Sequence, residues 1–155
     1  MKRAIPAILI FAQLALAAAQ ERGSQRLAAV PLQLPNGTRL SVEVARTPQQ
    51  QQIGMMFRRR IPLNTGMLFV FDQPGLQTFW MKNTLVSLDL IFISADRRIT
   101  SIAAAVPSTQ IDTPEQNIPR RSGVGKYVLE VAAGLAAQHR LKPGDRLRFN
   151  DEGRQ

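Results

Sequence analysis

Short apolar runs separated by turn residues fill the chain from about residue 30 to residue 149, and this pattern constrains the fold more than any other feature. The runs are roughly four to eight residues long, which is typical of strands and short for helices. Residues 40–44 alternate between apolar and polar side chains, whereas residues 66–71 are apolar on both faces, as in a buried strand. The pattern predicts a mainly β domain with a compact sandwich-like or barrel-like fold and one or two short helices. Strands are expected at residues 30–34, 40–44, 66–71, 76–81, 86–93, 99–106, 127–131 and 146–149.

Turn and capping signals mark the connections between these runs. Residues 36–37, Asn-Gly, supply the positive φ angles that a tight hairpin requires, and residues 72–75, Asp-Gln-Pro-Gly, have the composition of a turn. A short helix is expected to begin after Thr47, which can act as N-cap, and to end at Gly54. A second short helix is expected within residues 132–140.

Residues 107–125 break the strand rhythm, because they contain several prolines and glycines and almost no apolar periodicity. A loop of this length within a compact domain is more often functional or mobile than a passive connection. We therefore expect a loop here and treat it as a candidate lid over a binding site.

Residues 1–19 have the features of a secretory signal peptide. A basic start, Met1-Lys2-Arg3, precedes a mostly apolar stretch, and three alanines form the small-residue cleavage pattern before Gln20. The apolar stretch is shorter than the roughly 20 residues of a spanning helix, and no later segment is long enough to cross a membrane. We expect an exported, periplasmic or extracellular protein with a lead-in over residues 20–29, a single domain over residues 30–150 and a tail over residues 151–155.

The net charge is +9, and many of the arginines stand next to each other. A basic exported protein can bind anionic envelope polymers, lipid headgroups or nucleic acid. The aromatic residues, however, lie inside apolar runs and are not interleaved with the arginines, as a protein that stacks single-stranded nucleic acid would require. The pattern therefore argues against nucleic acid and favours a solvated basic surface.

Cysteine is absent and His139 is the single histidine. Thiol chemistry and thiolate metal sites are therefore excluded, and the usual zinc constellations cannot be built. We predict neither a metal site nor a cofactor, and we expect His139, in a polar helical stretch, to lie at the surface.

The stretch FWMKNTLVSLDLIFI, residues 79–93, places the carboxylate of Asp89 in an otherwise apolar strand. An ionised carboxylate without a partner costs several kcal/mol when it is removed from water. Asp89 therefore needs a cation, hydrogen-bond donors or a water-filled cleft. Lys82 is the nearest cation in the sequence.

Two interpretations of this cluster remain open from the residues alone, and the structural one is favoured. In the structural interpretation, Asp89 and Lys82 form a buried ion pair that fixes strand register, and Trp80 belongs to the core. In the functional interpretation, Trp80, Lys82, Asn83 and Asp89 line a cleft for a sugar or small anionic ligand. Trp80 would then stack on the ligand, Lys82 and Arg58 would hold an anionic group, and Asn83 and Asp89 would form hydrogen bonds to its polar atoms.

Glu130 supplies a second carboxyl group, between Leu129 and Val131 in an expected strand. Together with Asp89 it could form the acid/base pair of a metal-independent hydrolase, as in glycosidases. As part of an ordinary strand it would instead occupy the solvent-facing side. The sequence contains no arrangement that identifies a catalytic residue.

The chain resembles the DUF192 (UPF0127) family of small prokaryotic proteins, from about residue 40 to residue 149. Five motifs carry the resemblance and stand in the family's order: GMMFRRRIP, GMLFVF, FWMKNTLVSLDLIFI, YVLEVAAG and LKPGDRL. The resemblance implies a compact, mostly β sandwich-like domain that is often exported, and it implies no activity. Arg58, Trp80, Lys82, Asn83 and Asp89 fall on motif positions, which strengthens the polar cluster as a candidate site.

We therefore expect an exported module that binds a small polar or anionic ligand or an envelope polymer. The expected cleft is edged by Trp80, Lys82, Asn83 and Asp89, with Arg58 and Glu130 as outer members. The alternatives are a metal-independent hydrolase of an envelope polymer or sugar, with Asp89 and Glu130 as acid and base, and a structural or interaction protein without a small ligand. The sequence identifies neither the ligand nor the oligomeric state.

Overall fold

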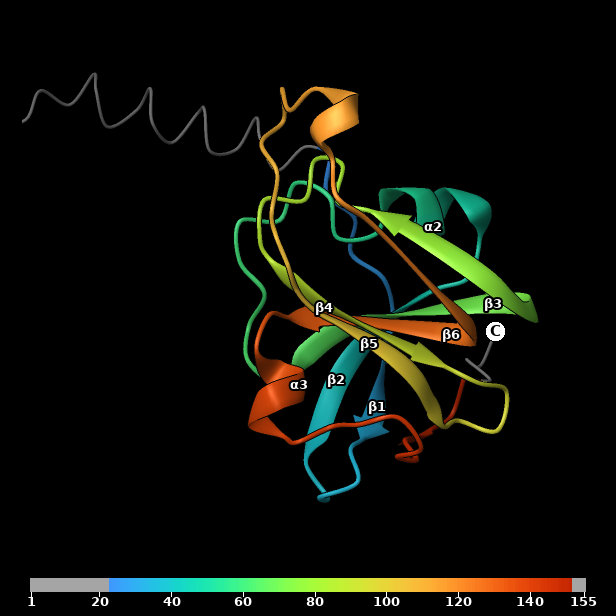
Figure 1. Ribbon diagram of the computed structural model, residues 1–155. Coiled ribbons are helices and arrows are strands. Elements are labelled where there is room, and N and C mark those ends of the chain that lie inside the picture. Colours follow the sequence, from blue (N-terminus) through green and yellow to red (C-terminus); the bar gives the residue numbers. More distant parts are fainter. Residues whose placement is uncertain (1–22, 152–155) are drawn as a thin grey trace, which may run out of the picture.

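The computed structural model describes residues 23–151, which form a seven-stranded sheet with the order β5-β4-β6-β3-β2-β1-β7 (Figure 1). The predicted signal peptide, residues 1–19, lies outside the described residues. The strands are β1 (Ala29–Gln33), β2 (Arg39–Ala45), β3 (Thr65–Trp80), β4 (Leu88–Ile93), β5 (Ile99–Val106), β6 (Arg120–Ala132) and β7 (Arg148–Phe149). The helices are α2 (Pro48–Ile53), α3 (Leu135–Gln138) and the 3-10 turn η1 (Glu115–Asn117).

Local signals explain the first part of the chain. Gly37, with φ of 88°, closes the hairpin in which β1 pairs antiparallel with β2. Thr47 caps α2 through a capping box with Gln50: the Thr47 side chain accepts from the Gln50 backbone N–H, and the Gln50 side chain accepts from the Thr47 N–H. α2 then connects β2 to β3, which run parallel. The predicted hairpin and first helix are therefore confirmed.

The predicted turn at residues 72–75 is wrong as a break between two strands, because β3 continues through this segment from Thr65 to Trp80. β6 pairs with β3 on both sides of this segment, and the register shifts between Val70 and Gly75. Residues 71–74 thus form an irregularity in one long strand, and pairing with β6 on both sides keeps the segment in β3 despite its turn composition.

The predicted loop at residues 107–125 is wrong over its second part, because β6 already begins at Arg120. Its glycines permit close packing of a strand: a Cβ atom on Gly123 would lie 2.4 Å from the ring of Phe92, and one on Gly125 would lie 2.8 Å from the backbone oxygen of Ile93. The glycines therefore mark a crowded strand crossing. The remaining loop, with Thr109 buried, leads into η1.

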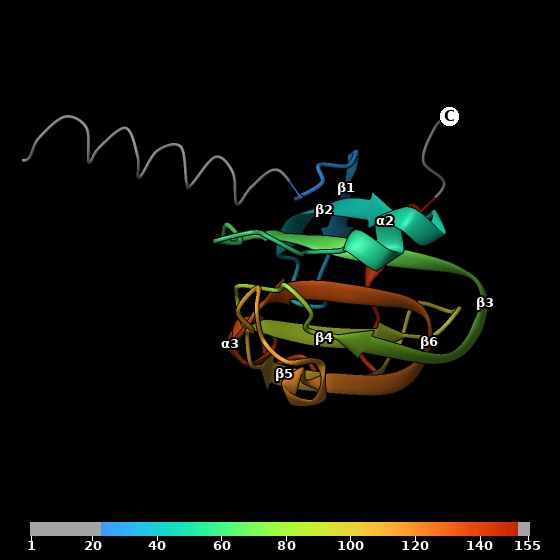
Figure 2. The same cartoon turned by 90° about the horizontal axis from the view of Figure 1, so that it is seen from above.

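β3 and β6 bend together at one side of the molecule, and the later half of β3 folds back over the sheet (Figure 2). Phe79 in this half contacts Phe69 in the first half edge-on, with ring centroids 4.9 Å apart, and Phe92 of β4 at 6.3 Å. This fold-back gives the sheet two separate buried faces.

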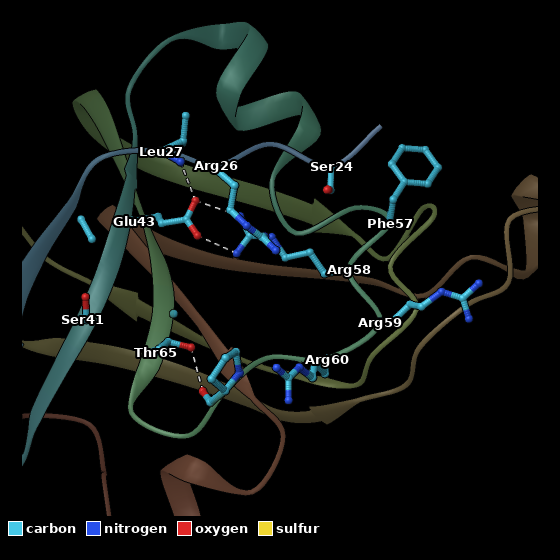
Figure 3. Close-up of a pocket in the computed structure, with 13 residues that line it drawn as sticks. Ser24, Arg26, Leu27, Ser41, Glu43, Phe57, Arg58, Arg59, Arg60 and Thr65 are labelled. Carbon is cyan, nitrogen blue, oxygen red and sulfur yellow. Dashed lines mark hydrogen bonds and ion pairs between the residues drawn. The ribbon is translucent and has the colours of Figure 1, made fainter. Parts of the chain in front are cut away.

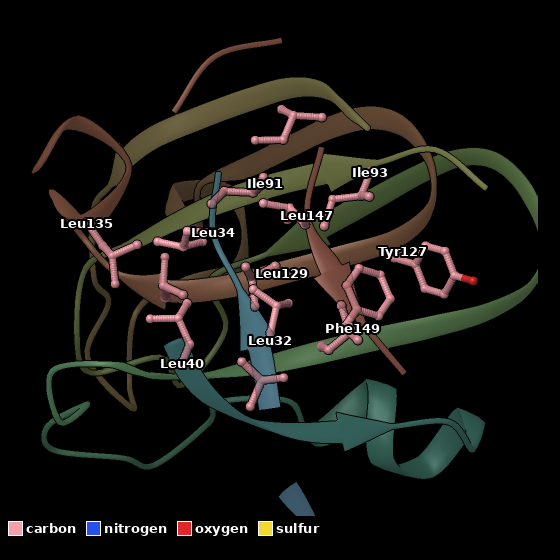
Figure 4. Close-up of a cluster of buried hydrophobic side chains, with 14 of the residues drawn as sticks. Leu32, Leu34, Leu40, Ile91, Ile93, Tyr127, Leu129, Leu135, Leu147 and Phe149 are labelled. Carbon is pink, nitrogen blue, oxygen red and sulfur yellow. The ribbon is translucent and has the colours of Figure 1, made fainter. Parts of the chain in front are cut away.

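One hydrophobic cluster fills the inside of the curled sheet, where β1, β2, β4, β6, β7 and α3 meet (Figure 4). It includes Leu32, Leu40, Ile91, Leu129 and Phe149. A second cluster lies on the opposite face under the folded-back half of β3, and includes Met67, Phe69, Leu90, Phe92 and Val128.

The fold is thus mainly β, with a curled sheet and two short helices, as the sequence predicts. Within residues 23–151, no helix has both the length and the hydropathy to cross a bilayer.

Candidate functional site

Asp89 is fully buried and its carboxylate accepts three backbone hydrogen bonds. Oδ1 accepts from the N–H of Ala105 at 2.8 Å, and Oδ2 accepts from the N–H groups of Gly134 at 3.0 Å and Ala136 at 2.9 Å. The first bond reaches the irregular end of β5, where Ala105 has φ of 49°, and the other two fix the start of α3. Asp89 therefore ties β5 and α3 to β4.

This geometry corrects two expectations about Asp89. Its exposure is 0 %, so it does not edge a solvent-filled cleft. The groups that donate to its carboxylate are backbone N–H groups and not Lys82. Asp89 therefore has a structural role, but the expected ion pair with Lys82 is wrong. Backbone donors from a bulge and a helix start cannot be recognised in the sequence, whereas a nearby lysine can.

Trp80, Lys82 and Asn83 lie at the end of β3 and in the turn that follows. The Nζ of Lys82 lies over the Trp80 ring, 4.8 Å from its centroid, and the guanidinium of Arg120 lies 5.7 Å from it. Asn83 has φ of 52°, and its carbonyl accepts a hydrogen bond from the N–H of Phe57. Lys82 therefore contacts the tryptophan that was expected to stack on a ligand, and Asn83 shapes the turn.

Glu130 lies on the opposite face of the sheet from Asp89. In the register of β4 and β6, Asp89 pairs with Val131 and Leu90 pairs with Glu130. Side chains of consecutive strand residues point to opposite faces, so the two carboxyl groups are separated by the sheet. They cannot act together across one cleft on a substrate, as the paired carboxylates of a glycosidase do.

Glu130 is buried, with 6 % exposure, and its Oε2 atom has no hydrogen-bond partner in the part of the chain that the structure describes. Burial raises the pKa of Glu130 to about 8, although the positive charge of Arg58 opposes the rise. Near pH 7 the folded protein therefore holds this carboxyl group mainly in its protonated, neutral form. A buried carboxylic acid of this kind can donate one hydrogen bond.

A pocket of about 200 Å³ borders Glu130, and we call it the Glu130 pocket. Its walls come from α2 and the turn after it, from both halves of β3 and from Thr84. Apolar and aromatic side chains form part of these walls (Met55, Met56, Phe69, Phe71, Phe79 and Trp80), and polar side chains of glutamine, threonine and Glu130 form the rest. Of the residues expected in the cleft, the structure brings Trp80 and Glu130 to this one pocket.

Arg58 is nine-tenths buried and forms a two-point ion pair with Glu43 of β2. Nη1 and Nη2 each donate to one Glu43 oxygen at 2.8 Å, and Nη2 also donates to the carbonyl of Gln25 at 2.7 Å. Burial would raise the pKa of Glu43, but hydrogen bonds from Arg58 and from the Leu27 N–H lower it below its usual value. This pair joins the turn after α2 to β2 and to the chain before β1.

Sequence reasoning did not find Glu43, because it stands at a polar position of an alternating strand and looks solvent-facing. It also did not find the methionines and phenylalanines of the Glu130 pocket, which have the same pattern as core residues. The one available signal was Glu130 itself, a carboxyl group between Leu129 and Val131.

The model of the DUF192 family, described as "Uncharacterized ACR", matches residues 32–149. No curated protein matches the chain significantly. A solved structure from Sinorhizobium meliloti 1021, described as a proposed transcription regulator, is 34% identical, with a TM-score of 0.66; the match covers 81% of this chain and 95% of that one. A protein of unknown function from Novosphingobium aromaticivorans DSM 12444 is 32% identical, also with a TM-score of 0.66, over 84% of this chain and 96% of that one.

Proposed function

The chain belongs to the DUF192 family, and from this premise we propose that it is an exported protein of the cell envelope that binds a small ligand in the Glu130 pocket. The observation that carries the proposal is that Glu130 lines the pocket and that its buried Oε2 atom has no hydrogen-bond partner within residues 23–151. Leaving a buried polar atom unsatisfied costs about 1–3 kcal/mol, and a ligand that meets it would remove this cost.

The composition of the pocket supports binding of a small molecule. Ligand sites are typically lined by apolar and aromatic side chains with a few convergent polar groups. Here Phe71, Phe79 and Trp80 supply apolar walls, and Glu130 supplies a buried carboxyl group. Gln51 and Gln77 add amide groups, and the Gln51 side chain is held by a hydrogen bond to the carbonyl of Val70.

Size and protonation narrow the ligand class. The volume of about 200 Å³ is below the roughly 300–1,000 Å³ of sites for drug-sized molecules, so the ligand is small. Because Glu130 is mainly protonated near neutral pH, it presents a donor, and the matching ligand atom is a neutral acceptor such as a carbonyl or hydroxyl oxygen. A small neutral polar molecule with one flat apolar face satisfies both conditions.

The N-terminal pattern of residues 1–19 supports export, since it combines a basic start, an apolar stretch and small residues before Gln20. Fractionation of the source cells checks this part of the proposal separately: the protein should appear in the periplasm or medium with Gln20 as its first residue. Full-length protein in the cytoplasm would contradict export and leave the pocket proposal unaffected.

Binding of a protein partner is a second candidate function, and the folded-back β3–β6 ribbon supports it. Leu76 and Val124 face each other across this ribbon, and both are exposed, at 71% and 58%. A pair of adjacent exposed apolar side chains is a small patch compared with established interfaces. The Glu130 pocket therefore carries the main proposal.

Fluorescence of Trp80 tests the pocket directly, because it is the single tryptophan of the chain and lines the pocket. A set of neutral sugars, amides and small aromatic alcohols is titrated, and melting temperature is followed in parallel, since a ligand selective for the folded state must raise it. Glu130→Met should weaken a compound that binds by about tenfold, because its acceptor loses the donor. Glu130→Gln keeps a donor amide and should retain binding, also above pH 8, where binding to the unmodified protein should decline.

Glu115→Gln is the matched control, because Glu115 is an exposed glutamate outside the pocket. Binding should be unchanged in this variant. Compounds that bind equally well to the unmodified protein and to Glu130→Met would place the ligand elsewhere and refute the proposal.

A further inference from the structure

A second concave site lies on the other side of the turn after α2, and we call it the arginine cleft (Figure 3). Its volume is about 460 Å³, more than twice that of the Glu130 pocket. Four arginines line it: Arg26, Arg58, Arg59 and Arg60. Glu43 is the carboxylate among its lining residues, so the cleft retains an excess of positive charge.

The arginines differ in how they are held. Arg58 is fixed at the base by Glu43 and by the Gln25 carbonyl, and its Nε atom is buried with no partner among the described residues. Arg59 and Arg60, by contrast, are exposed, and the ion pairs found within residues 23–151 do not include them. The cleft thus combines one guanidinium held by three hydrogen bonds with exposed ones that have no ion-pair partner within residues 23–151.

The side chains of Arg26 and Arg58 lie together near Glu43, whereas those of Arg59 and Arg60 extend to separate parts of the rim (Figure 3). Guanidinium groups spread in this way match several anionic groups better than a single one. Guanidinium donors match the oxygens of phosphate and carboxylate groups, and a concave surface of one charge sign raises the local concentration of anions.

We propose that the arginine cleft binds a small polyanion that carries at least two phosphate or carboxylate groups. This inference goes beyond the Glu130 pocket, which fits a small neutral ligand. The hydroxyl groups of Ser41 and Thr65 also border the cleft, and the Thr65 hydroxyl donates to the Pro62 carbonyl at 2.7 Å, leaving its oxygen able to accept.

The test uses tripolyphosphate and citrate as two separate probes, titrated into the purified protein by calorimetry at low and moderate salt. Binding of tripolyphosphate alone would identify phosphate as the preferred group, and binding of citrate alone would identify carboxylate. Both results require affinity that falls as salt rises, because the rim arginines are exposed and screened by ions. The variant Arg59→Gln/Arg60→Gln should weaken binding about tenfold or more, since it removes two charge-assisted contacts.

The matched control is Arg39→Gln/Arg148→Gln, which removes the same charge from exposed positions of β2 and β7 outside the cleft. Affinity in this control should fall less than twofold. Equal weakening in both double variants, or no binding of either probe at low salt, would overturn the proposal. Failure of both probes together with tight binding of a DNA oligonucleotide that depends on Arg59 and Arg60 would overturn it in favour of a nucleic-acid surface.

Discussion

Asp89 and Glu130 lie one residue pair apart on neighbouring strands, yet their carboxyl groups point to opposite faces of the sheet. The buried carboxylate of Asp89 accepts hydrogen bonds from three backbone N–H groups. The buried Oε2 atom of Glu130, by contrast, has no hydrogen-bond partner within residues 23–151. The two acids therefore have different roles. Asp89 stabilises the fold, and Glu130 is the carboxyl group that the proposed ligand would contact.

Asp89→Asn should lower the free energy of unfolding by about 3 kcal/mol, because hydrogen bonds to a charged acceptor contribute roughly 1.5–3 kcal/mol each. An asparagine has one acceptor oxygen, so its amide group would face either the Ala105 N–H or those of Gly134 and Ala136. Urea unfolding measures the loss. Asp96→Asn is the control, because Asp96 is exposed, and its effect on stability should be far smaller than that of Asp89→Asn. A similar small loss for Asp89→Asn would contradict the assigned role.

Glu130 should make the protein less stable as pH rises. Its pKa is about 8 in the folded protein against an ordinary value of 4.5, so between these values the folded state keeps a proton that the unfolded chain has released. The free energy of unfolding therefore falls through this pH range, by at most about 1.4 kcal/mol per pH unit, and the contribution of the neutral acid is lost above pH 8. Glu130→Gln should remove this slope and be more stable than the unmodified protein at pH 9. Urea unfolding at several pH values tests this, and an unchanged slope would refute it.

The ion pair of Arg58 and Glu43 should be essential for stability. Arg58→Met leaves a largely buried carboxylate without its cation, which typically costs about 3–5 kcal/mol. Arg58→Lys should cost less, but still about 1–2 kcal/mol, because an ammonium group cannot donate to both Glu43 oxygens and the Gln25 carbonyl in the same geometry. Thermal and urea unfolding of both variants rank the effects. Small and equal losses of stability in both variants would show that the ion pair is not essential for stability.

Arg58→Lys also provides a test of the link between the two sites. The charge of Arg58 lowers the pKa of Glu130, so keeping the charge in Arg58→Lys should leave the Glu130 titration near pH 8, whereas Arg58→Met should move it higher. Carboxyl carbon chemical shifts followed by NMR across pH 6 to 10 report the titration. A Glu130 titration that is identical in both variants would contradict the coupling.

Much of the fold could be predicted from the sequence, because strand alternation, the Asn-Gly hairpin and the Thr47 cap are local signals. The failures are nonlocal. The segment 72–75 has turn residues but stays in β3 because β6 pairs with the strand on both sides of it. Gly123 and Gly125 look like loop residues but lie in β6, where other chain segments pass closely. The site was harder to predict for the same reason. The donors to Asp89 come from residues 16 to 47 positions away, and Glu130 shares a pocket with side chains that look like ordinary core.

Gly75 and Gly125 face each other across β3 and β6 and allow a matched test of the strand crossing. Gly125→Ala should destabilise the protein by about 2–3 kcal/mol, because the new Cβ atom would lie 2.8 Å from two backbone oxygens that cannot move independently. Gly75→Ala should change stability by less than about 0.5 kcal/mol or raise it slightly, since nothing lies within 4 Å of its Cβ position. Urea unfolding of the two variants side by side gives the answer. Comparable effects at both positions would mean that β6 does not pass β4 as closely as described.

The contact between Lys82 and Trp80 allows an experiment to distinguish a structural role of Lys82 from a role in ligand binding. Lys82 lies over the Trp80 ring at 4.8 Å, and a cation at this position typically contributes about 0.5–1 kcal/mol at an exposed site. Lys82→Gln should therefore lower the free energy of unfolding by this amount and shift the emission of Trp80, the single tryptophan of the chain. Ligand affinity in the Glu130 pocket should change by less than about twofold, because Glu130 and the aromatic walls supply the contacts to the ligand.

Lys126→Gln serves as the control. It removes a partly buried lysine that lies over a different ring, that of Tyr127, and it should leave Trp80 emission unchanged. Unaltered stability and emission in Lys82→Gln, with a large loss of ligand affinity, would instead return Lys82 to the ligand-binding role expected from the sequence.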